Sequence, residues 1–103
     1  MLASIITKNM NLIHILCEKH KVKELYVFGS AVSNRFTEES DVDLIVKFKT
    51  HVRVEEYADL YFDLAENFES LFKRKVDLMT DKTIGNKFLK QSIDESKQVI
   101  YAA

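Results

Sequence analysis

The feature that most constrains the fold is the segment DVDLIVKF at residues 41–48. Successive side chains of a β-strand point to opposite faces of its sheet, so residues two apart share a face. One face of this segment carries the apolar side chains of Val42, Leu44, Val46 and Phe48. Asp41 and Asp43 both lie on the other face. The chain must therefore form a sheet that buries one face of this strand and holds two carboxylates together on the other.

The apolar pattern of the whole chain predicts an α/β fold, in the order α-β-α-β-α-β-α. Helices are predicted at residues 4–20, 30–35, 53–73 and 83–95. Strands are predicted at residues 24–28, 41–48 and 75–79, with residues 98–102 as a further strand or an ordered tail. Ser4 is expected to cap the first helix.

The connections between the predicted strands indicate how they pair. About a dozen residues separate strand 24–28 from strand 41–48, which is the lower limit for a parallel crossover, so we expect an antiparallel pair. The helix at 53–73 is long enough for a right-handed crossover to a parallel strand at 75–79. A chain of 103 residues is expected to form one domain. The prediction is one α/β domain, residues 1–103, with helices flanking a small mixed sheet.

Composition excludes several classes of protein. Fifteen Lys and Arg residues are balanced by sixteen Asp and Glu residues, so the chain lacks the excess positive charge of a non-specific nucleic-acid binder. Cys17 is the only cysteine, which excludes a domain built on internal disulfides and predicts a small core residue. No apolar stretch approaches the roughly 20 residues that cross a bilayer. With no signal-peptide pattern at its start, we expect a cytoplasmic protein with neither membrane nor nucleic acid as partner.

Asp41, Asp43 and Asp77 form a candidate metal site. Two like charges on one strand face repel each other, and a bound cation is the obvious reason to keep them. Asp77 alternates with Val76 and Leu78 in the next strand, so it can project from the same face. Carboxylate oxygens suit Mg²⁺, two ions can clamp a phosphoryl transfer, and a third carboxylate can take a proton. The alternatives are a solvated strand end for the first pair and an exposed strand position for Asp77.

Gly29 and Ser30 form a candidate phosphate site. A glycine directly after a strand allows close backbone approach and unusual dihedral angles. A serine at the start of a helix offers a hydroxyl next to free N–H groups, which together attract anions. Ser30 can equally be a plain helix cap, and the two roles are compatible. Cations on one side and phosphate oxygens on the other suit a nucleoside triphosphate bound to Mg²⁺.

These residues resemble a known family. Gly29-Ser30, ten further residues and then Asp41-Val42-Asp43 are similar to the G-S-x10-D-x-D signature of the DNA polymerase β-like nucleotidyltransferases. The short chain, the later "VDLM" and the tail "TIGNKFLKQSIDESKQVIY" resemble the minimal nucleotidyltransferase branch. The resemblance implies that Gly29 and Ser30 bind the triphosphate, that Asp41 and Asp43 bind Mg²⁺, and that Asp77 is the third carboxylate and general base.

The resemblance also implies a reaction and a partner. An acceptor hydroxyl would attack the α-phosphate of a nucleotide and release pyrophosphate. Members of the minimal branch are often antitoxins paired with a HEPN ribonuclease toxin, and some transfer AMP from ATP to a tyrosine of that toxin. We therefore expect an antitoxin with ATP as substrate and a HEPN-type toxin as partner. A binding module that neutralises the toxin by contact is the alternative, and a nucleic-acid-extending enzyme ranks last.

The chain departs from the family pattern directly after Gly-Ser. Many relatives carry arginine there, whereas this chain has Ala31 and Val32. The first arginine is Arg35, which is either a phosphate ligand or a surface residue. The basic cluster Lys73-Arg74-Lys75 is predicted to form a solvated face, or else to contact an acidic partner or a phosphate.

One small domain supplies few walls for a substrate, so a second copy or a partner is expected to complete the site. The candidate contacts for that second chain are Met10, Ile15, Leu60 and Phe62. The alternative for each is burial under a neighbouring element. The histidines His14, His20 and His51 are not spaced as a metal site and are expected to be partly exposed.

Overall fold

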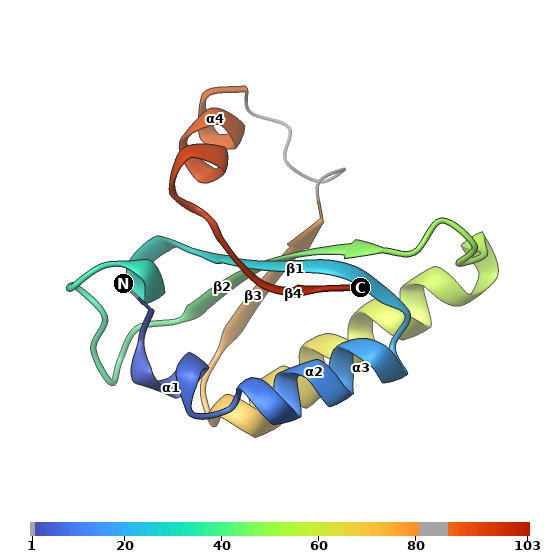
Figure 1. The fold of residues 1–103 in the computed structure, drawn as a ribbon, viewed down its shortest axis with the longest axis horizontal. Helices are drawn as coiled ribbons and strands as arrows, with labels where there is room; N and C mark the ends of the chain where they lie inside the picture. The colour runs from blue at the N-terminus through green and yellow to red at the C-terminus, as the bar shows by residue number, and fades with distance from the viewer. Residues whose placement is uncertain (1, 81–86) are drawn as a thin grey trace.

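Four strands form one mixed sheet in the computed structural model, which describes residues 2–80 and 87–103. The strands are β1 (Val22–Phe28), β2 (Val42–Phe48), β3 (Val76–Thr80) and β4 (Gln98–Ala102). They lie in the order β3-β2-β1-β4 (Figure 1). β1 is antiparallel to both β2 and β4, whereas β2 and β3 are parallel. The predicted mixed sheet, its antiparallel pair and its parallel crossover are confirmed.

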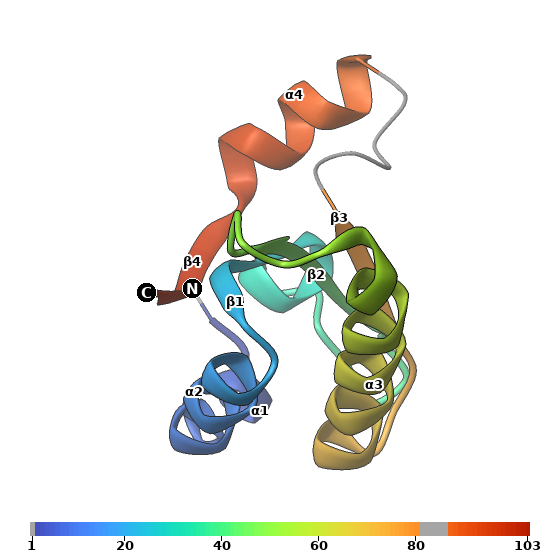
Figure 2. The same ribbon diagram turned by 90° about the vertical axis from the view of Figure 1, so that its right-hand side faces the viewer.

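The helices lie on both sides of the sheet. They are α1 (Ser4–Thr7), α2 (Met10–Lys19), α3 (Val54–Phe72), α4 (Lys87–Ser96) and a 3₁₀ turn, η1 (Gly29–Val32). α2 and α3 cover one face, and α4 lies beyond the other face (Figure 2). The face toward α2 and α3 is therefore closed by helices, while the opposite face is only partly covered by α4.

The core lies between the sheet and the α2–α3 layer. Val42, Leu44 and Val46 are completely buried there, as the alternation in β2 predicts. α3 contributes three buried residues at helical spacing, namely Leu64, Phe68 and Phe72. Each such side chain stabilises the fold by about 1.5–3 kcal/mol relative to an exposed one. This packing leaves β2 one orientation, in which its acidic residues face away from the core.

The first predicted helix is divided in two. α1 ends at Thr7 and α2 starts at Met10. Between them the Asn9 side-chain amide donates to the carbonyl of Ile5 at 2.8 Å, and such a local bond competes with continuous helix. The predicted cap at Ser4 is wrong, because Ser4 is the first helical residue and makes no capping bond.

The other predicted elements need smaller corrections. Residues 98–102 are a strand, because their backbone pairs with β1 at the edge of the sheet. The short helix predicted at 30–35 is the single 3₁₀ turn η1. The last helix is described from Lys87 to Ser96, and residues 83–86 of its predicted range lie outside the described residues.

The four apolar residues proposed as contacts for a second chain divide into two pairs. Met10 and Leu60 pack against the core, which agrees with the alternative of burial. Ile15 is 58% exposed and Phe62 is 67% exposed. Among the described residues, no helix is long and apolar enough to cross a bilayer.

Cys17 is buried in the core, as predicted, and burial raises the pKa of its thiol to about 12. The prediction of partly exposed histidines is wrong for His20, which is only 3% exposed. Its ring nitrogens contact the carbonyl oxygen of Leu16 at 2.7 Å and Asp63 Oδ2 at 2.5 Å. His20 therefore links the end of α2 to the middle of α3.

We predict that His20→Ala lowers the free energy of unfolding by about 1–3 kcal/mol, because it removes the link between the two helices that cover the core. Urea denaturation followed by circular dichroism measures this change. His51→Ala is the matched control, because His51 is exposed in the turn before α3 and should change the stability by less than about 0.5 kcal/mol. Equal effects of the two substitutions would contradict the structural role of His20.

Candidate functional site

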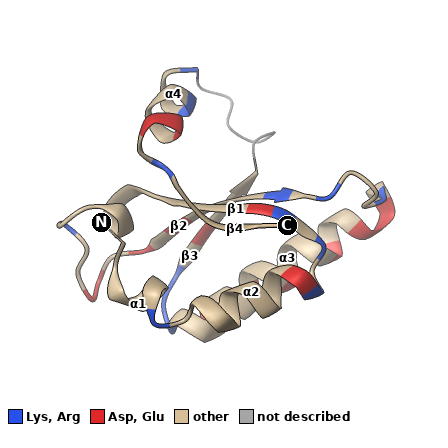
Figure 3. Cartoon of the chain, viewed as in Figure 1, with Lys and Arg blue, Asp and Glu red and all other residues tan. Residues whose placement is uncertain are grey.

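The parallel register of β2 and β3 brings two carboxylates face to face. Asp43 lies directly opposite Asp77, one step after Val42 and Val76 pair. Because Val42 and Val76 point into the core, Asp43 and Asp77 point to the opposite face. Figure 3 shows acidic positions on these two neighbouring strands, with basic positions directly before β3. The structure thus brings together the two aspartates that the sequence placed on separate strands.

Gly29 closes this site from the side of β1. Phe28, the last residue of β1, pairs with Asp43, so Gly29 begins the turn directly beside that aspartate. Gly29 has φ of +72°, a left-handed conformation that residues with a Cβ rarely adopt. A Cβ at this position would also lie 2.5 Å from Asp43 Oδ2. Glycine is required here both for its backbone angle and for the space that the Asp43 carboxylate occupies.

Ser30 lies at the side of a pocket of about 570 Å³ between η1 and α4. Gly29, Ser30, Ser33 and Arg35 line it from the η1 side. The α4 side adds apolar and hydroxyl side chains, namely Leu89, Ser92, Ile93 and Ser96. The α4 serines could not be predicted from the sequence, because their approach to η1 depends on how the chain returns over the sheet. The arrangement offers hydroxyls and one cation to an anionic ligand.

The departure from the family pattern has a structural basis. Ala31 is fully buried and belongs to the hydrophobic core, so an arginine at this position would place a charge in the core. Arg35 is exposed but lines the same pocket as Gly29 and Ser30. Arg35 is the arginine that lines this pocket.

The electrostatics of the site center on Asp43. Burial raises its pKa from the usual 3.8 to about 6, with further contributions from the charge of Asp77, a hydrogen bond with Asp77 and the charge of Asp41. Lys75 acts in the opposite direction. Its Nζ lies 3.9 Å from Asp41 Oδ2 and 3.9 Å from Asp77 Oδ1. The carboxylates therefore repel one another, and a single lysine partly offsets that repulsion.

The donor set fits a hard cation. All three side chains offer carboxylate oxygens, which Mg²⁺ prefers, and Asp43 and Asp77 already face each other across the strand pair. Within residues 2–80 and 87–103, no three acidic, cysteine or histidine side chains are already gathered as metal ligands. Asp41 stands one register step away, beside Lys75. The residues that would hold a metal at this site are the opposed Asp43 and Asp77, with Asp41 beside them.

A second, largely apolar pocket of about 470 Å³ adjoins the two opposed aspartates. Besides Asp43 and Asp77 it is lined by Phe28, Tyr61, Phe62, Ala65, Val76, Leu78 and Met79. The Tyr61 hydroxyl donates to the Leu78 carbonyl, which fixes that ring at the edge of β3. The sequence indicated a core position for Tyr61 and a partner contact for Phe62. Only the packing of α3 against β3 reveals that both residues border the site.

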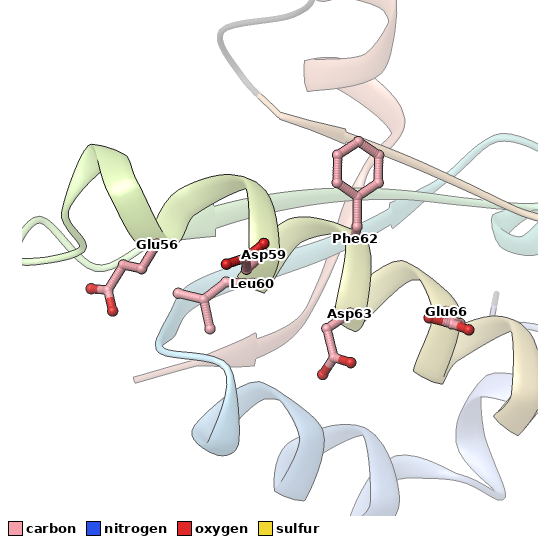
Figure 4. A pocket seen from close by; sticks show the side chains of 6 residues that line it. All are labelled: Glu56, Asp59, Leu60, Phe62, Asp63 and Glu66. Carbon is pink, nitrogen blue, oxygen red and sulfur yellow. The ribbon is translucent and has the colours of Figure 1, made fainter.

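Phe62 also borders a third pocket, of about 500 Å³, on the outer surface of α3. Figure 4 shows it with the five other lining residues Glu56, Asp59, Leu60, Asp63 and Glu66. The exposed ring of Phe62 therefore connects the surface of α3 with the pocket beside the aspartates.

Comparison with known sequences gives matches over most of the chain. Residues 10–100 match the nucleotidyltransferase domain family. Protein adenylyltransferase MntA from Thermococcus cleftensis is 33% identical over 88 residues, which cover 84% of this chain and 80% of that protein. A protein from Methanocaldococcus jannaschii, named provisionally as a protein adenylyltransferase, is 41% identical over 81 residues, which cover 79% of each chain.

Solved structures share the fold. A structure described provisionally as a minimal nucleotidyltransferase superposes with a TM-score of 0.68 at 23% identity, covering 95% of both chains. A chain of a toxin–antitoxin complex with AMP-PNP gives 0.70 at 22% identity and covers 92% of this chain and 74% of its own length. A chain of the tri-AMPylated Shewanella oneidensis HEPN toxin in complex with MNT antitoxin gives 0.64 at 20% identity, covering 95% and 73%. At these identities the likeness shows the fold alone.

We predict that Asp43→Asn stabilises the metal-free protein at pH 8. The pKa of Asp43 is higher in the folded than in the unfolded chain, so its ionisation costs stability as pH rises from about 4 to about 6. The full shift corresponds to about 3 kcal/mol, and solvent around this half-exposed group reduces the expected gain to about 1–2 kcal/mol. Urea denaturation at pH 4 and pH 8 measures it.

The gain should be present at pH 8 and vanish at pH 4, where the wild-type carboxyl is increasingly protonated in both states. Asp59→Asn is the matched control, because Asp59 is exposed on α3. A pH-independent gain, or an equal gain from Asp59→Asn, would contradict the electrostatic explanation.

We predict that Gly29→Ala lowers the free energy of unfolding by about 1–2 kcal/mol, because alanine disfavours a positive φ. Its Cβ also forces the Asp43 carboxylate to move. Gly29→Asn separates the two effects, because asparagine tolerates this backbone region but still carries the Cβ. We expect Gly29→Ala to lose divalent-metal affinity as well, since the Asp43 carboxylate has moved. Gly29→Asn should recover part of the stability and none of the divalent-metal affinity, which calorimetric titration measures. Recovery of both would show that the close approach to Asp43 has no functional role.

Proposed function

This chain belongs to the nucleotidyltransferase domain family, and on that premise we propose that it transfers AMP from ATP to a hydroxyl of a partner protein, with Mg²⁺. The protein adenylyltransferase name of the Thermococcus cleftensis relative supports both AMP as the transferred group and a protein as the acceptor. The observation that carries the proposal is the opposed pair Asp43 and Asp77, with the Gly29 backbone packed against the first.

The triphosphate would lie in the pocket between η1 and α4. Gly29 permits close approach of the backbone, and the Ser30 hydroxyl can donate to a phosphate oxygen. Arg35 supplies a guanidinium at the same pocket. A triphosphate in this pocket would have its α-phosphate on the side of Asp43, because Gly29 lines the pocket and lies against that carboxylate. Nucleotide affinity is expected to be modest, since Ala31 stands where many relatives carry arginine.

Asp41, Asp43 and Asp77 would hold the Mg²⁺ ions. When bound, these ions neutralise charge on the phosphate oxygens of the nucleotide. Asp77 would act as general base and take the proton of the acceptor hydroxyl. That oxygen forms a bond to the α-phosphorus, the bond to the bridging oxygen breaks, and pyrophosphate leaves. Asp77 is half-exposed, so the proton can pass on to solvent.

The pocket beside the aspartates suits an aromatic acceptor. Its walls include three aromatic rings, Phe28, Tyr61 and Phe62, and the thioether of Met79. Such a lining favours a phenol, which can pack its ring between these side chains and point its hydroxyl at Asp77. The acceptor is therefore proposed to be a tyrosine hydroxyl. Residues 1–103 would act as one minimal domain, and the partner chain would complete the walls around the acceptor.

We propose a HEPN-type toxin as the partner and an antitoxin role for this chain. Two structural neighbours come from toxin–antitoxin complexes, one of them with an AMPylated HEPN toxin. Neutralisation by contact alone is the second candidate, and the buried Ala31 favours it because the phosphate site lacks the usual arginine. The two candidates differ in whether neutralisation needs the carboxylates.

We predict that the wild-type protein with ATP and Mg²⁺ adds the mass of an AMP group to its HEPN-type toxin partner. Intact-mass spectrometry of the toxin measures the reaction. Asp77→Asn should slow it by about 10²–10⁴-fold, because a general base contributes that much. Asp59→Asn is the control and should leave the rate unchanged.

If the wild-type protein adds no mass to the toxin with any of the four nucleoside triphosphates, the proposed enzymatic activity is contradicted. If the double variant Asp41→Asn, Asp43→Asn still binds and silences the toxin, contact alone accounts for neutralisation.

A further inference from the structure

Lys75 lies at the corner of the carboxylate cluster. It directly precedes β3, so strand alternation places it on the same face as Asp77. The register of β2 and β3 places it beside Asp41. Four side chains thus form two rows across the strand pair, Asp41 with Lys75 and Asp43 with Asp77. The Val42 backbone N–H donates to the Lys75 carbonyl at 3.1 Å, which anchors this corner.

Among the described residues, Lys75 is the only basic side chain that forms an ion pair with any of the three aspartates, and it does so with Asp41 and Asp77. Arg74, its neighbour, is engaged elsewhere. Its Nη1 donates to the carbonyls of Thr37 and Ser40 at 3.0 and 2.9 Å, and its guanidinium lies 4.7 Å from the centre of the Phe36 ring. Arg74 therefore holds the loop before β2, and Lys75 alone supplies positive charge to the cluster.

The Lys75 ammonium lies equally far from Asp41 and Asp77. Its Nζ is 3.9 Å from an oxygen of Asp41 and equally far from one of Asp77, so it favours neither. The side chain is 67% exposed and can swing into solvent without opening the core. A lysine ammonium is a compact charge on a flexible stem, which suits a cation that must leave.

We propose that Lys75 is a positioning residue that occupies the cation position of the Asp41–Asp43–Asp77 cluster and is displaced when a divalent metal binds. This inference rests on the metal site of the proposed function. In the metal-free state the lysine limits repulsion, because its ammonium lies within ion-pair distance of both Asp41 and Asp77. The ammonium therefore competes with the metal, because both would bind the same carboxylate oxygens of Asp41 and Asp77.

The competition has a measurable consequence. Removing the ammonium takes away the basic partner of Asp41 and Asp77, so a divalent ion should bind more tightly. For charges about 4 Å apart at a solvated surface we expect a gain in affinity of about three- to tenfold. If Lys75 has only a structural role, removing it should leave the metal affinity unchanged. If Lys75 itself supports metal binding, removing it should lower the metal affinity.

The test is titration of the metal-free full chain with Mn²⁺ alone, followed by electron paramagnetic resonance of the free ion. Lys75→Gln is expected to bind Mn²⁺ about three- to tenfold more tightly than the wild type. Lys75→Arg keeps the charge and should bind no more tightly than the wild type. Lys19→Gln is the matched control, because it removes one exposed lysine at the far end of α2 and should leave the affinity unchanged.

Thermal unfolding of each variant without metal verifies that it folds. Unchanged or weaker binding by Lys75→Gln, with normal binding by the wild type, overturns the role of Lys75 and leaves the proposed function standing. If the wild type binds no Mn²⁺, or if Asp43→Asn binds it equally well, the metal site of the proposed function fails together with this inference.

Discussion

The parallel pairing of β2 with β3 is the interaction on which the site depends. The apolar faces of both strands are buried against α3, which fixes their register, since a slip of one residue would turn the apolar side chains of one strand out to solvent. In that register Asp43 and Asp77 meet on the opposite face. Hydrophobic packing on one side of the sheet thus holds together two carboxylates that would separate if they were free to do so.

The cost of that arrangement is visible around the site. Burial and the neighbouring acids raise the pKa of Asp43, the Gly29 backbone leaves room only for its carboxylate, and Lys75 stands between Asp41 and Asp77. The crowded carboxylates make the site receptive to a cation, and the Lys75 ammonium is a cation already beside them. The stable core on the α2–α3 side supplies the free energy that keeps such a strained set of charges in place.

Two pockets flank the site: Asp43 and Asp77 line one of them, and Gly29, which lies against Asp43, lines the other. The pocket between η1 and α4 has hydroxyls and a guanidinium and suits phosphates, whereas the pocket at the β3 edge is mostly aromatic and apolar. An α-phosphate from the first and a hydroxyl from the second would meet at Asp43 and Asp77. This geometry agrees with membership of the nucleotidyltransferase domain family.

The sequence alone determined the α/β class, the strand pairing and the positions of Gly29, Asp43 and Asp77, because two-residue alternation and a glycine after a strand are local signals. It could not show that Asn9 divides the first helix, that His20 is buried between helices, or that Ser96 and Tyr61 border the site. Those facts depend on which distant elements pack together. Tertiary structure also decided the place of Lys75, because only the register of two strands separated by a whole helix sets an ammonium beside Asp41.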